Sequence, residues 1–250
     1  MDFFDTLIAQ LKNAAEKNNS FTVAPETWEV FIDPSKAVRQ TENKTVEKSA
    51  EIMVDAPTQT EKTESFSEFE LEKLQANILE CRDCPLAEIR QNPALSYGNT
   101  HAKLMIVIEN PSLADDENGR IFSGEVGVLL DKMLLAMGLK REETYITSIV
   151  KCRTPGNRPP SENEVKSCRM KFFDHEVKVV KPECILAFGA GFAKNILHRE
   201  GSISTLRGNF DSYEGIPVMS TFNPAYLLRQ PSAKKVVWGD LQMVMKALGL

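Results

Sequence analysis

Short apolar runs alternate with segments of helical periodicity through the chain beyond residue 69. The apolar runs predict four strands, at 104–108, 144–150, 184–189 and 217–222. The helical periodicity predicts helices near 69–80, 125–137, 161–180, 190–199 and 232–248. Alternating strands and helices of these lengths favour parallel strands with helices on both faces. The pattern therefore predicts an α/β fold: a three-layer α/β/α sandwich around a central, mostly parallel four-stranded sheet. Functional loops are expected at the carboxyl ends of its strands.

The first 68 residues follow a different pattern. Apolar residues repeat at helical spacing from Phe3 to Leu11, which indicates a short amphipathic helix. Residues 41–67 are rich in Thr, Glu, Lys and Ser, so they cannot bury enough apolar surface to offset the entropy of ordering. We therefore expect an acidic, largely disordered arm over residues 1–68 and a folded domain over 69–250. The helix within residues 1–15 either docks on a protein partner or folds back on its own domain.

Charge is distributed unevenly between these two parts. The chain has a net charge of −5, but residues 1–68 hold 13 acidic and 7 basic side chains, and the rest hold 22 and 23. The folded part is therefore close to neutral, and the net charge does not exclude a polyanionic partner. No apolar run approaches the roughly 18 to 20 residues of a membrane span, and the N-terminus lacks the basic start of a secretory signal. We expect a cytoplasmic protein, a monomer with no membrane contact.

Four of the five cysteines have a spacing that indicates a metal site. Cys81 and Cys84 form a C-x2-C pair just before the first predicted strand, and Cys152 and Cys168 form a C-x15-C pair just after the second strand and inside the following helix. In a cytoplasmic chain such cysteines indicate metal binding or catalysis rather than disulfides. Spacing alone favours an iron–sulfur cluster and leaves tetrahedral zinc and unrelated buried thiols as alternatives. Cys184 lies in an apolar strand and is expected to be a buried structural thiol.

Four stretches of the folded part resemble motifs of the family-4 uracil-DNA glycosylases, the iron–sulfur branch of that superfamily. KCRTPGNRPP (151–160) resembles the family's KCRPPGNR segment, and NGRIFSGEVGVLL (118–130) resembles its G-R-P-F-x-G-x-A-G-x-L-L segment. IENPSLADD (108–116) resembles a degraded G-E-x-P-G…E-D motif, and NPAYLLRQP (223–231) resembles H-P-A-Y-L-L-R-x-P. The resemblance spans residues 69–250 and implies a uracil-DNA glycosylase-like domain. It also implies that Cys81, Cys84, Cys152 and Cys168 are the ligands of a [4Fe–4S] cluster.

The resemblance also implies a reaction. Such an enzyme flips a nucleotide out of DNA and hydrolyses the bond between uracil and deoxyribose. Positive charge develops on the sugar and negative charge on the departing base, so a carboxylate and hydrogen-bond donors are needed. The matching catalytic candidates are Glu109, Asp115 and Asn223, although a solvated acidic loop is the alternative for Asp115.

The remaining candidates are base-binding and DNA-binding positions, most of them in the same motifs. Phe122 matches a residue that stacks on the flipped base, with plain core packing as the alternative. Base-binding positions fall at Ile108, Asn110, Phe122, Ser148 and Asn157. DNA-binding positions fall at Arg153, Arg158, Arg207, Leu228 and Arg229, where the arginines would bind phosphates and Leu228 would wedge into the gap left by the flipped base.

At two of these positions, the residue that would bind or activate the base differs from the family's residue. The family's uracil-reading Asn is Ser148 here, and a hydroxyl cannot reproduce the two-point match of an amide with uracil. The family's motif His is Asn223, which can donate a hydrogen bond but cannot titrate. Ile108 and Ser112 replace glycines, which changes how closely the backbone can approach a ligand.

Three functional hypotheses remain in play. The first is a DNA-repair glycosylase acting on uracil or another deaminated base, with activity weakened or specificity altered by Ser148 and Asn223. The second is a non-catalytic iron–sulfur DNA-binding protein of the same fold. The third is a subunit that its N-terminal arm recruits to a protein partner.

Overall fold

The computed structural model describes residues 59–250, and it describes side chains from Glu68 onward. Residues 1–58 of the predicted arm, with its amphipathic helix and the partner-binding segment 1–15, lie outside the described residues. The described part forms one unit, Gln59–Leu250. Within it, no helix combines the length and the apolar character needed to cross a membrane.

A six-stranded sheet forms the centre of this unit. Its strands are β1 (Tyr97–Gly98), β2 (Leu104–Ile108), β3 (Tyr145–Ser148), β4 (Cys184–Phe188), β5 (Phe210–Tyr213) and β6 (Ile216–Thr221). The strand order is β1-β3-β2-β4-β6-β5. The pairs β3–β2, β2–β4 and β4–β6 are parallel, whereas β1 and β5 add to the two edges in antiparallel orientation. The four predicted strands are therefore the parallel centre of the sheet.

The predicted count of four strands missed both edges. β1 has only two residues, too short to give a period-two pattern. β5 is joined to β6 by a two-residue turn, Glu214–Gly215, whose φ angles are +49° and +85°. Positive φ at both central residues is the geometry of a tight hairpin, and a glycine at the second position favours it. The sequence therefore did contain a hairpin signal at this edge.

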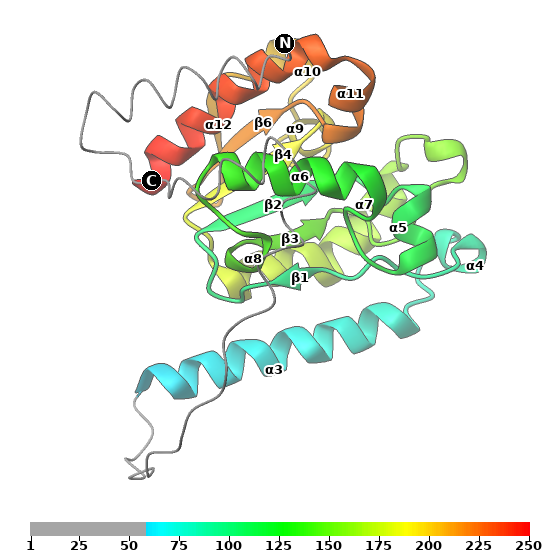
Figure 1. The fold of residues 1–250 in the computed structure, drawn as a ribbon. Coiled ribbons are helices and arrows are strands. Elements are labelled where there is room, and N and C mark those ends of the chain that lie inside the picture. Colours follow the sequence, from blue (N-terminus) through cyan, green and yellow to red (C-terminus); the bar gives the residue numbers. More distant parts are fainter. Residues whose placement is uncertain (1–58) are drawn as a thin grey trace, which may run out of the picture. The chain divides into compact units, whose positions relative to one another are not determined.

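Helices connect the strands and flank the sheet (Figure 1). The α-helices are α3 (Gln59–Glu80), α4 (Leu86–Ile89), α5 (Leu113–Asn118), α6 (Gly124–Ala136), α7 (Glu162–Cys168), α8 (Asp174–Val180), α9 (Gly191–Asn195), α10 (Ile203–Leu206), α11 (Pro224–Arg229) and α12 (Lys234–Leu248). Helix α3 begins ten residues before the predicted start at 69, inside the stretch predicted to be a linker. The predicted helix 161–180 is present but passes through a π-helical turn, Arg169–Phe173, between α7 and α8.

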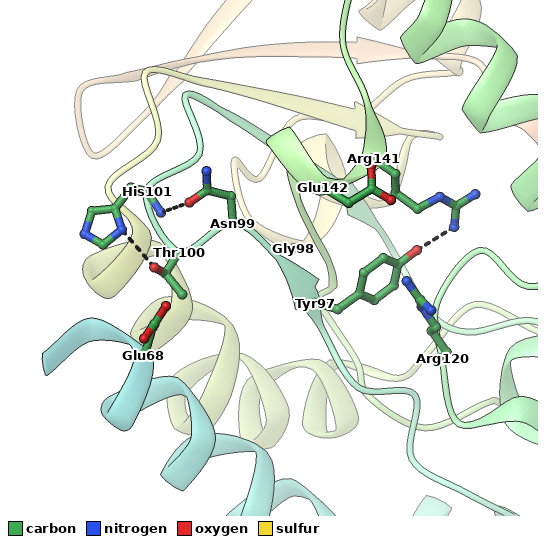
Figure 2. Close-up of a pocket in the computed structure, with 9 residues that line it drawn as sticks. All are labelled: Glu68, Tyr97, Gly98, Asn99, Thr100, His101, Arg120, Arg141 and Glu142. Carbon is green, nitrogen blue, oxygen red and sulfur yellow. Dashed lines mark hydrogen bonds between the residues drawn. The ribbon is translucent and has the colours of Figure 1, made fainter. Parts of the chain in front are cut away.

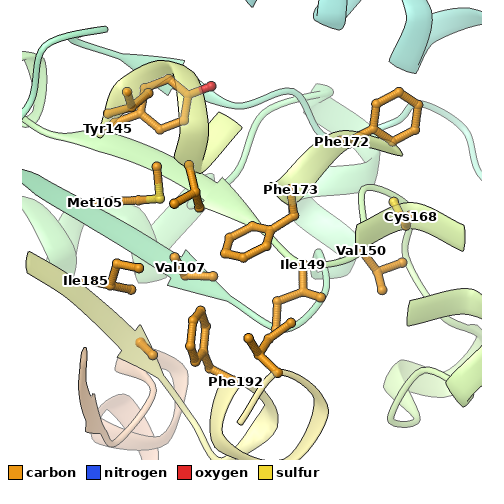
Figure 3. Packing of buried hydrophobic residues seen from close by; sticks show 14 of the residues in the cluster. Met105, Val107, Tyr145, Ile149, Val150, Cys168, Phe172, Phe173, Ile185 and Phe192 are labelled. Atoms are coloured by element: carbon orange, nitrogen blue, oxygen red, sulfur yellow. The ribbon is translucent and has the colours of Figure 1, made fainter. Parts of the chain in front are cut away.

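Each face of the sheet packs against a different set of helices. Met105 and Val107 of β2 belong to a cluster that includes Ile78 of α3, Phe173 beside α8 and Phe192 of α9 (Figure 3). The alternate residues of β2 are equally buried but belong to the opposite face, where α6 lies and α12 contacts β4 and β6. Strands buried on both faces read as continuous apolar runs, which is why LMIVI and CILAF were recognisable. The structure confirms the α/β sandwich.

Candidate functional site

The loops that leave β2 and β3 are joined beyond the ends of their strands. Ile108 pairs with Ser148 at the end of the parallel ladder. The backbone N–H of Ile149 then donates to the Ile108 carbonyl at 2.9 Å, and that of Val150 donates to the Glu109 carbonyl at 3.0 Å. These bonds bring the IENPS and SIVKC segments together at the carboxyl edge of the sheet, as the sequence predicted.

Glu109 is a partly buried carboxylate at this edge. Its Oε1 accepts a hydrogen bond from the Asn195 side chain of α9 at 2.8 Å. Burial raises the pKa of Glu109 above its ordinary value, while the Asn195 hydrogen bond and the attraction of Lys194 oppose that shift. A carboxylate with a perturbed pKa at the end of a parallel strand is typical of a functional group.

The two aspartates of the same motif are bound to backbone. Asp115 is 3% exposed, and its carboxylate accepts from the backbone N–H of Ser112 at 2.9 Å and of Ser123 at 2.7 Å. Ser112 and Asp115 form a capping box at the start of α5. Asp116 accepts from the backbone N–H of Gln91 at 3.1 Å. Both carboxylates therefore hold the loops around the site, and Glu109 has the freer carboxylate.

Phe122 is held in an unusual backbone conformation. Its φ is +57°, in the left-handed region that side chains other than glycine rarely adopt. The ring is 4% exposed and packs edge-to-face on Phe188, at the end of β4, with ring centroids 5.8 Å apart. Residues kept in such conformations by their surroundings cluster at functional sites. The contact of the buried ring with Phe188 is the core packing that was the alternative to base stacking.

Tyr97 and Arg141, which are hydrogen-bonded to each other (Figure 2), fix the backbone around Phe122. The Tyr97 hydroxyl donates to the Ile121 carbonyl at 2.9 Å and accepts from Arg141 at 2.6 Å. Arg141 also donates to the Phe122 carbonyl at 3.2 Å. Gly127 lies against the same carbonyl, where a Cβ would come within 1.9 Å of the oxygen, so only glycine fits there.

Tyr97 and Arg141 also line a polar pocket together with Arg120, which stacks on the Tyr97 ring. None of the predicted base-binding residues lines this pocket.

The two positions that depart from the family have different surroundings. The Ser148 side chain is fully buried, and its hydroxyl has no hydrogen-bond partner among the described residues. A buried hydroxyl without a partner costs free energy, so its presence calls for a bound group or a functional role. Asn223 caps α11, because its Oδ1 accepts from the backbone N–H of Ala225 at 2.8 Å. This bond leaves the Asn223 amide N–H groups available as donors.

Two other base-binding candidates form contacts within the protein. Asn110 donates to the Thr154 hydroxyl at 3.1 Å, which joins the first motif to the KCRTPGNR segment. Asn157 is exposed, has a φ of +55°, and accepts from Arg153 at 3.1 Å. Asn157 is therefore both a turn residue and a support for one DNA-binding candidate.

The DNA-binding candidates divide into paired and exposed groups. Arg158 forms an ion pair with Glu164 at 2.7 Å and lowers the pKa of that carboxyl to about 2. Arg207 is paired with Asp240, which is buried, and also donates to the Val236 carbonyl. Leu228 and Arg229 are exposed on α11. Because its donors are used internally, Arg207 is less suited to phosphate contact than Arg229.

The four spaced cysteines line one cavity. Cys81 and Cys84 precede α4, Cys152 follows β3, and Cys168 ends α7. Burial raises the pKa of the Cys152 thiol, and it raises the pKa of Cys168 to about 12. Arg90 donates to the Cys152 sulfur at 3.0 Å, and the backbone N–H of Lys151 donates to the Cys168 sulfur at 3.3 Å. These donors favour the thiolate forms that metal binding requires.

No three Cys, His, Asp or Glu side chains between residues 68 and 250 are gathered closely enough to hold a single metal ion. The arrangement is four thiols around a cavity rather than around one point. Cys184 lies apart from them, fully buried in β4.

A buried charge network lies behind the cysteines. Lys151 and Glu176 are 1% and 0% exposed, and Lys151 Nζ lies 2.7 Å from Glu176 Oε2. Lys151 also donates to the Thr147 hydroxyl and to the Ser148 carbonyl. The network therefore connects the predicted base-binding end of β3 with the cysteine cavity. No sequence motif indicated this network, although a lysine directly after the apolar run YITSIV was a signal of an unusual buried charge.

Comparisons with known proteins show the family to which this chain belongs. The model of the uracil DNA glycosylase superfamily matches residues 95–242. A type-4 uracil-DNA glycosylase of Thermotoga maritima is 34% identical over 176 residues, which cover 69% of this chain and 91% of that protein. The type-4 uracil-DNA glycosylase of Sulfurisphaera tokodaii is 33% identical over 185 residues, covering 70% and 83%. A DNA polymerase of Bacillus phage SP01 is 30% identical over 164 residues, which cover 65% of this chain and only 18% of the polymerase.

The match over residues 95–242, in a chain with a mixed sheet and helices on both faces, shows that the protein is a member of the uracil DNA glycosylase superfamily. Within that superfamily, the chain belongs to the type-4 uracil-DNA glycosylases. The resemblance inferred from the motifs is confirmed.

Proposed function

We propose that this protein is a DNA-repair glycosylase that hydrolyses the N-glycosidic bond of uracil, or of another deaminated base, in DNA. The observation that carries the proposal is the position of Glu109 in a chain of this family. Glu109 is a partly buried carboxylate that directly follows β2. The last residue of β2, Ile108, is paired with Ser148, the last residue of β3. A carboxylate there can stabilise the positive charge that develops on the sugar as the base departs.

Phe122 would bind the base together with Ser148 and Asn223, the two positions at which this chain differs from the family. The flipped base would stack on Phe122, beside Phe188, and approach the unpartnered Ser148 hydroxyl. A single hydroxyl can donate or accept but discriminates less than an amide, so a broader base preference is expected. The Asn223 amide would donate to the departing base in place of the family's histidine.

A base-release assay tests this function. The purified protein is incubated with a single-stranded oligonucleotide that contains one uracil, and free base is measured against a thymine control. We expect release from the parent, and up to about 100-fold faster release from Asn223→His, because a cationic donor stabilises the departing anion better. Ser148→Asn is expected to sharpen the preference for uracil over other deaminated bases.

The negative outcomes of this assay are distinct. Absence of release from the parent would overturn the glycosylase proposal, whatever the two variants do. Tight binding of the uracil strand without release would instead favour the second hypothesis, a DNA-binding protein without turnover.

We further propose that Cys81, Cys84, Cys152 and Cys168 hold a [4Fe–4S] cluster. Four thiols around one cavity suit a cubane, which takes one thiolate at each iron, better than a single zinc ion. The donors from Arg90 and from the Lys151 backbone are of the kind that stabilise charge on ligand sulfurs. A bound cluster would cross-link the segment before α4, the end of β3 and α7. No step of the reaction needs to pass through it.

Substitution of the cysteines tests the cluster. Cys152→Ser and Cys168→Ser are each expected to remove the broad absorbance near 400 nm, to lower the iron content and to destabilise the domain. Cys184→Ser is the matched control, because this thiol is buried in β4 away from the cavity; it should keep both iron and absorbance. Iron retained in full by the first two variants would contradict the ligand assignment.

A further inference from the structure

The short helix α9 presents two residues to Glu109, and no sequence motif pointed to either. Asn195 donates its amide N–H to Glu109 Oε1 at 2.8 Å. Gly191, one turn earlier, lies directly against the same side chain. A Cβ built at Gly191 would come within 2.4 Å of Glu109 Cδ and 2.6 Å of its Cβ and Cγ. The stem of Glu109 therefore occupies the space that a side chain at position 191 would need.

The main core holds α9 rigidly. Phe192 is 2% exposed and packs edge-to-face on Phe173 and on Tyr213, with ring centroids 5.8 Å apart in both pairs (Figure 3 shows Phe173 and Phe192). Ala193 is fully buried. Functional side chains are positioned most accurately when their supports stand on rigid elements. Because Phe192 lies between Gly191 and Asn195 in the helix, its anchoring fixes both residues against β2.

The contact uses only one oxygen of the carboxylate. Oε1 is occupied by Asn195, whereas Oε2 accepts no hydrogen bond from the described residues. Among the charged groups of the described residues, Lys194 acts on Glu109. This exposed lysine lies in α9 beside Asn195, and its positive charge attracts the carboxylate. Glu109 is thus held at its stem and at one oxygen, and the second oxygen remains for substrate or water.

We infer that Asn195 is a positioning residue for Glu109: with Gly191 it selects one rotamer of the carboxylate and leaves Oε2 for the reacting nucleotide. The inference rests on the proposed glycosylase function, because Glu109 is the charged group of that reaction. The positioning of Glu109 accounts both for the hydrogen bond from Asn195 and for the glycine at position 191, where a side chain would collide with Glu109. A hydrogen bond to the charged form of a carboxyl also favours ionisation, so Asn195 keeps Glu109 in the state that stabilises a cationic sugar.

Titration of Glu109 tests the inference without any need for activity. The protein is labelled with carboxyl-¹³C glutamate, the Glu109 signal is identified by its loss in Glu109→Gln, and its pKa is measured by NMR. We expect the pKa to rise in Asn195→Ala, because the donor is lost, and to rise further in Asn195→Asp, which puts a second carboxylate there. The control is Asn118→Ala, which removes an exposed amide bonded to the Ala114 carbonyl and should leave the Glu109 titration unchanged.

Kinetics give the second readout. In Asn195→Ala, kcat for base release at neutral pH is expected to fall on the order of tenfold with little change in KM, since a hydrogen bond to a charged group is lost. The acid limb of the pH profile should move to higher pH with the Glu109 pKa. A Glu109 titration and kcat equal to the parent's in folded Asn195→Ala would overturn the inference. If the parent releases no base, the proposed function fails, and the titration alone decides whether Asn195 positions Glu109.

Discussion

Replacing Glu109 by glutamine is expected to lower the rate of base release by about 100- to 1,000-fold. Glutamine has nearly the same shape and can still accept the Asn195 hydrogen bond through its amide oxygen. It cannot carry the negative charge that balances the developing charge on the sugar. The loss should therefore fall on kcat, with KM little changed, because the lost interaction operates in the transition state.

The same group sets a pH dependence whose sign differs for activity and for stability. Burial raises the pKa of Glu109, so activity should rise with pH through that raised pKa, as the carboxylate forms. Between the ordinary and the raised pKa the folded state holds the proton more tightly than the unfolded state. Stability therefore falls as pH rises through that window and stays lower above it.

Removal of this carboxyl should consequently cost no stability at neutral pH. Glu109→Gln is expected to melt no lower than the parent at pH 7 or higher, while it loses activity. Melting curves and single-turnover base release, measured on the same preparation, check both statements. Glu117→Gln is the control, because Glu117 is an exposed acid of α5 and should leave both quantities unchanged. Activity retained by Glu109→Gln would remove Glu109 from the mechanism.

Replacing Lys151 by methionine is expected to destabilise the domain by about 3–5 kcal/mol, because it leaves a buried charge without its partner. Glu176 is fully buried, and Lys151 is its cationic partner at 2.7 Å. Glu176 would keep the hydrogen bonds from Ser96 and Thr147, which are neutral donors. For a domain of this size the melting temperature should fall by roughly 10 °C.

A double variant separates the charge from the loss of packing. Lys151→Met combined with Glu176→Gln removes both charges, and the glutamine keeps an oxygen that can accept from Ser96. Replacing both members of a buried pair is often nearly neutral, so the double variant should recover most of the lost stability. Absorbance near 400 nm is recorded on each variant, since Lys151 precedes Cys152. A double variant as unstable as Lys151→Met would show that the lysine acts through packing or through the cysteines instead.

The motifs predicted the position of the site because parallel strands end at one edge. The runs LMIVI and TYITSIV were recognisable, so the sequence alone could place the segments that follow them side by side. The roles within that edge were less predictable. Asp115 and Glu109 were both candidates in the motif, but only Asp115 is bound to two backbone N–H groups. Local sequence does not reveal which carboxylate accepts hydrogen bonds from the backbone of the surrounding loops.

The partners of the site residues were hidden for a similar reason. Asn195 is 86 positions from Glu109, and Arg141 is 19 positions from Phe122. Neither residue belongs to a repeat or to a spaced motif, so no periodicity marks it. Their contacts arise because the packing of the fold brings segments together that are far apart in the sequence. Arg90, which donates to Cys152, is 62 positions away and was missed on the same grounds.

The sequence by itself determined the α/β class, the four central strands, the family and the four spaced cysteines, because each depends on local periodicity or on a contiguous motif. The tertiary structure decided the two edge strands, the buried Lys151–Glu176 pair, the left-handed backbone of Phe122 and the cradle of Asn195 and Gly191 around Glu109. These features are contacts between distant segments, or they depend on the space left by packing. Such contacts follow from how helices pack on the sheet, which no single stretch of the chain encodes.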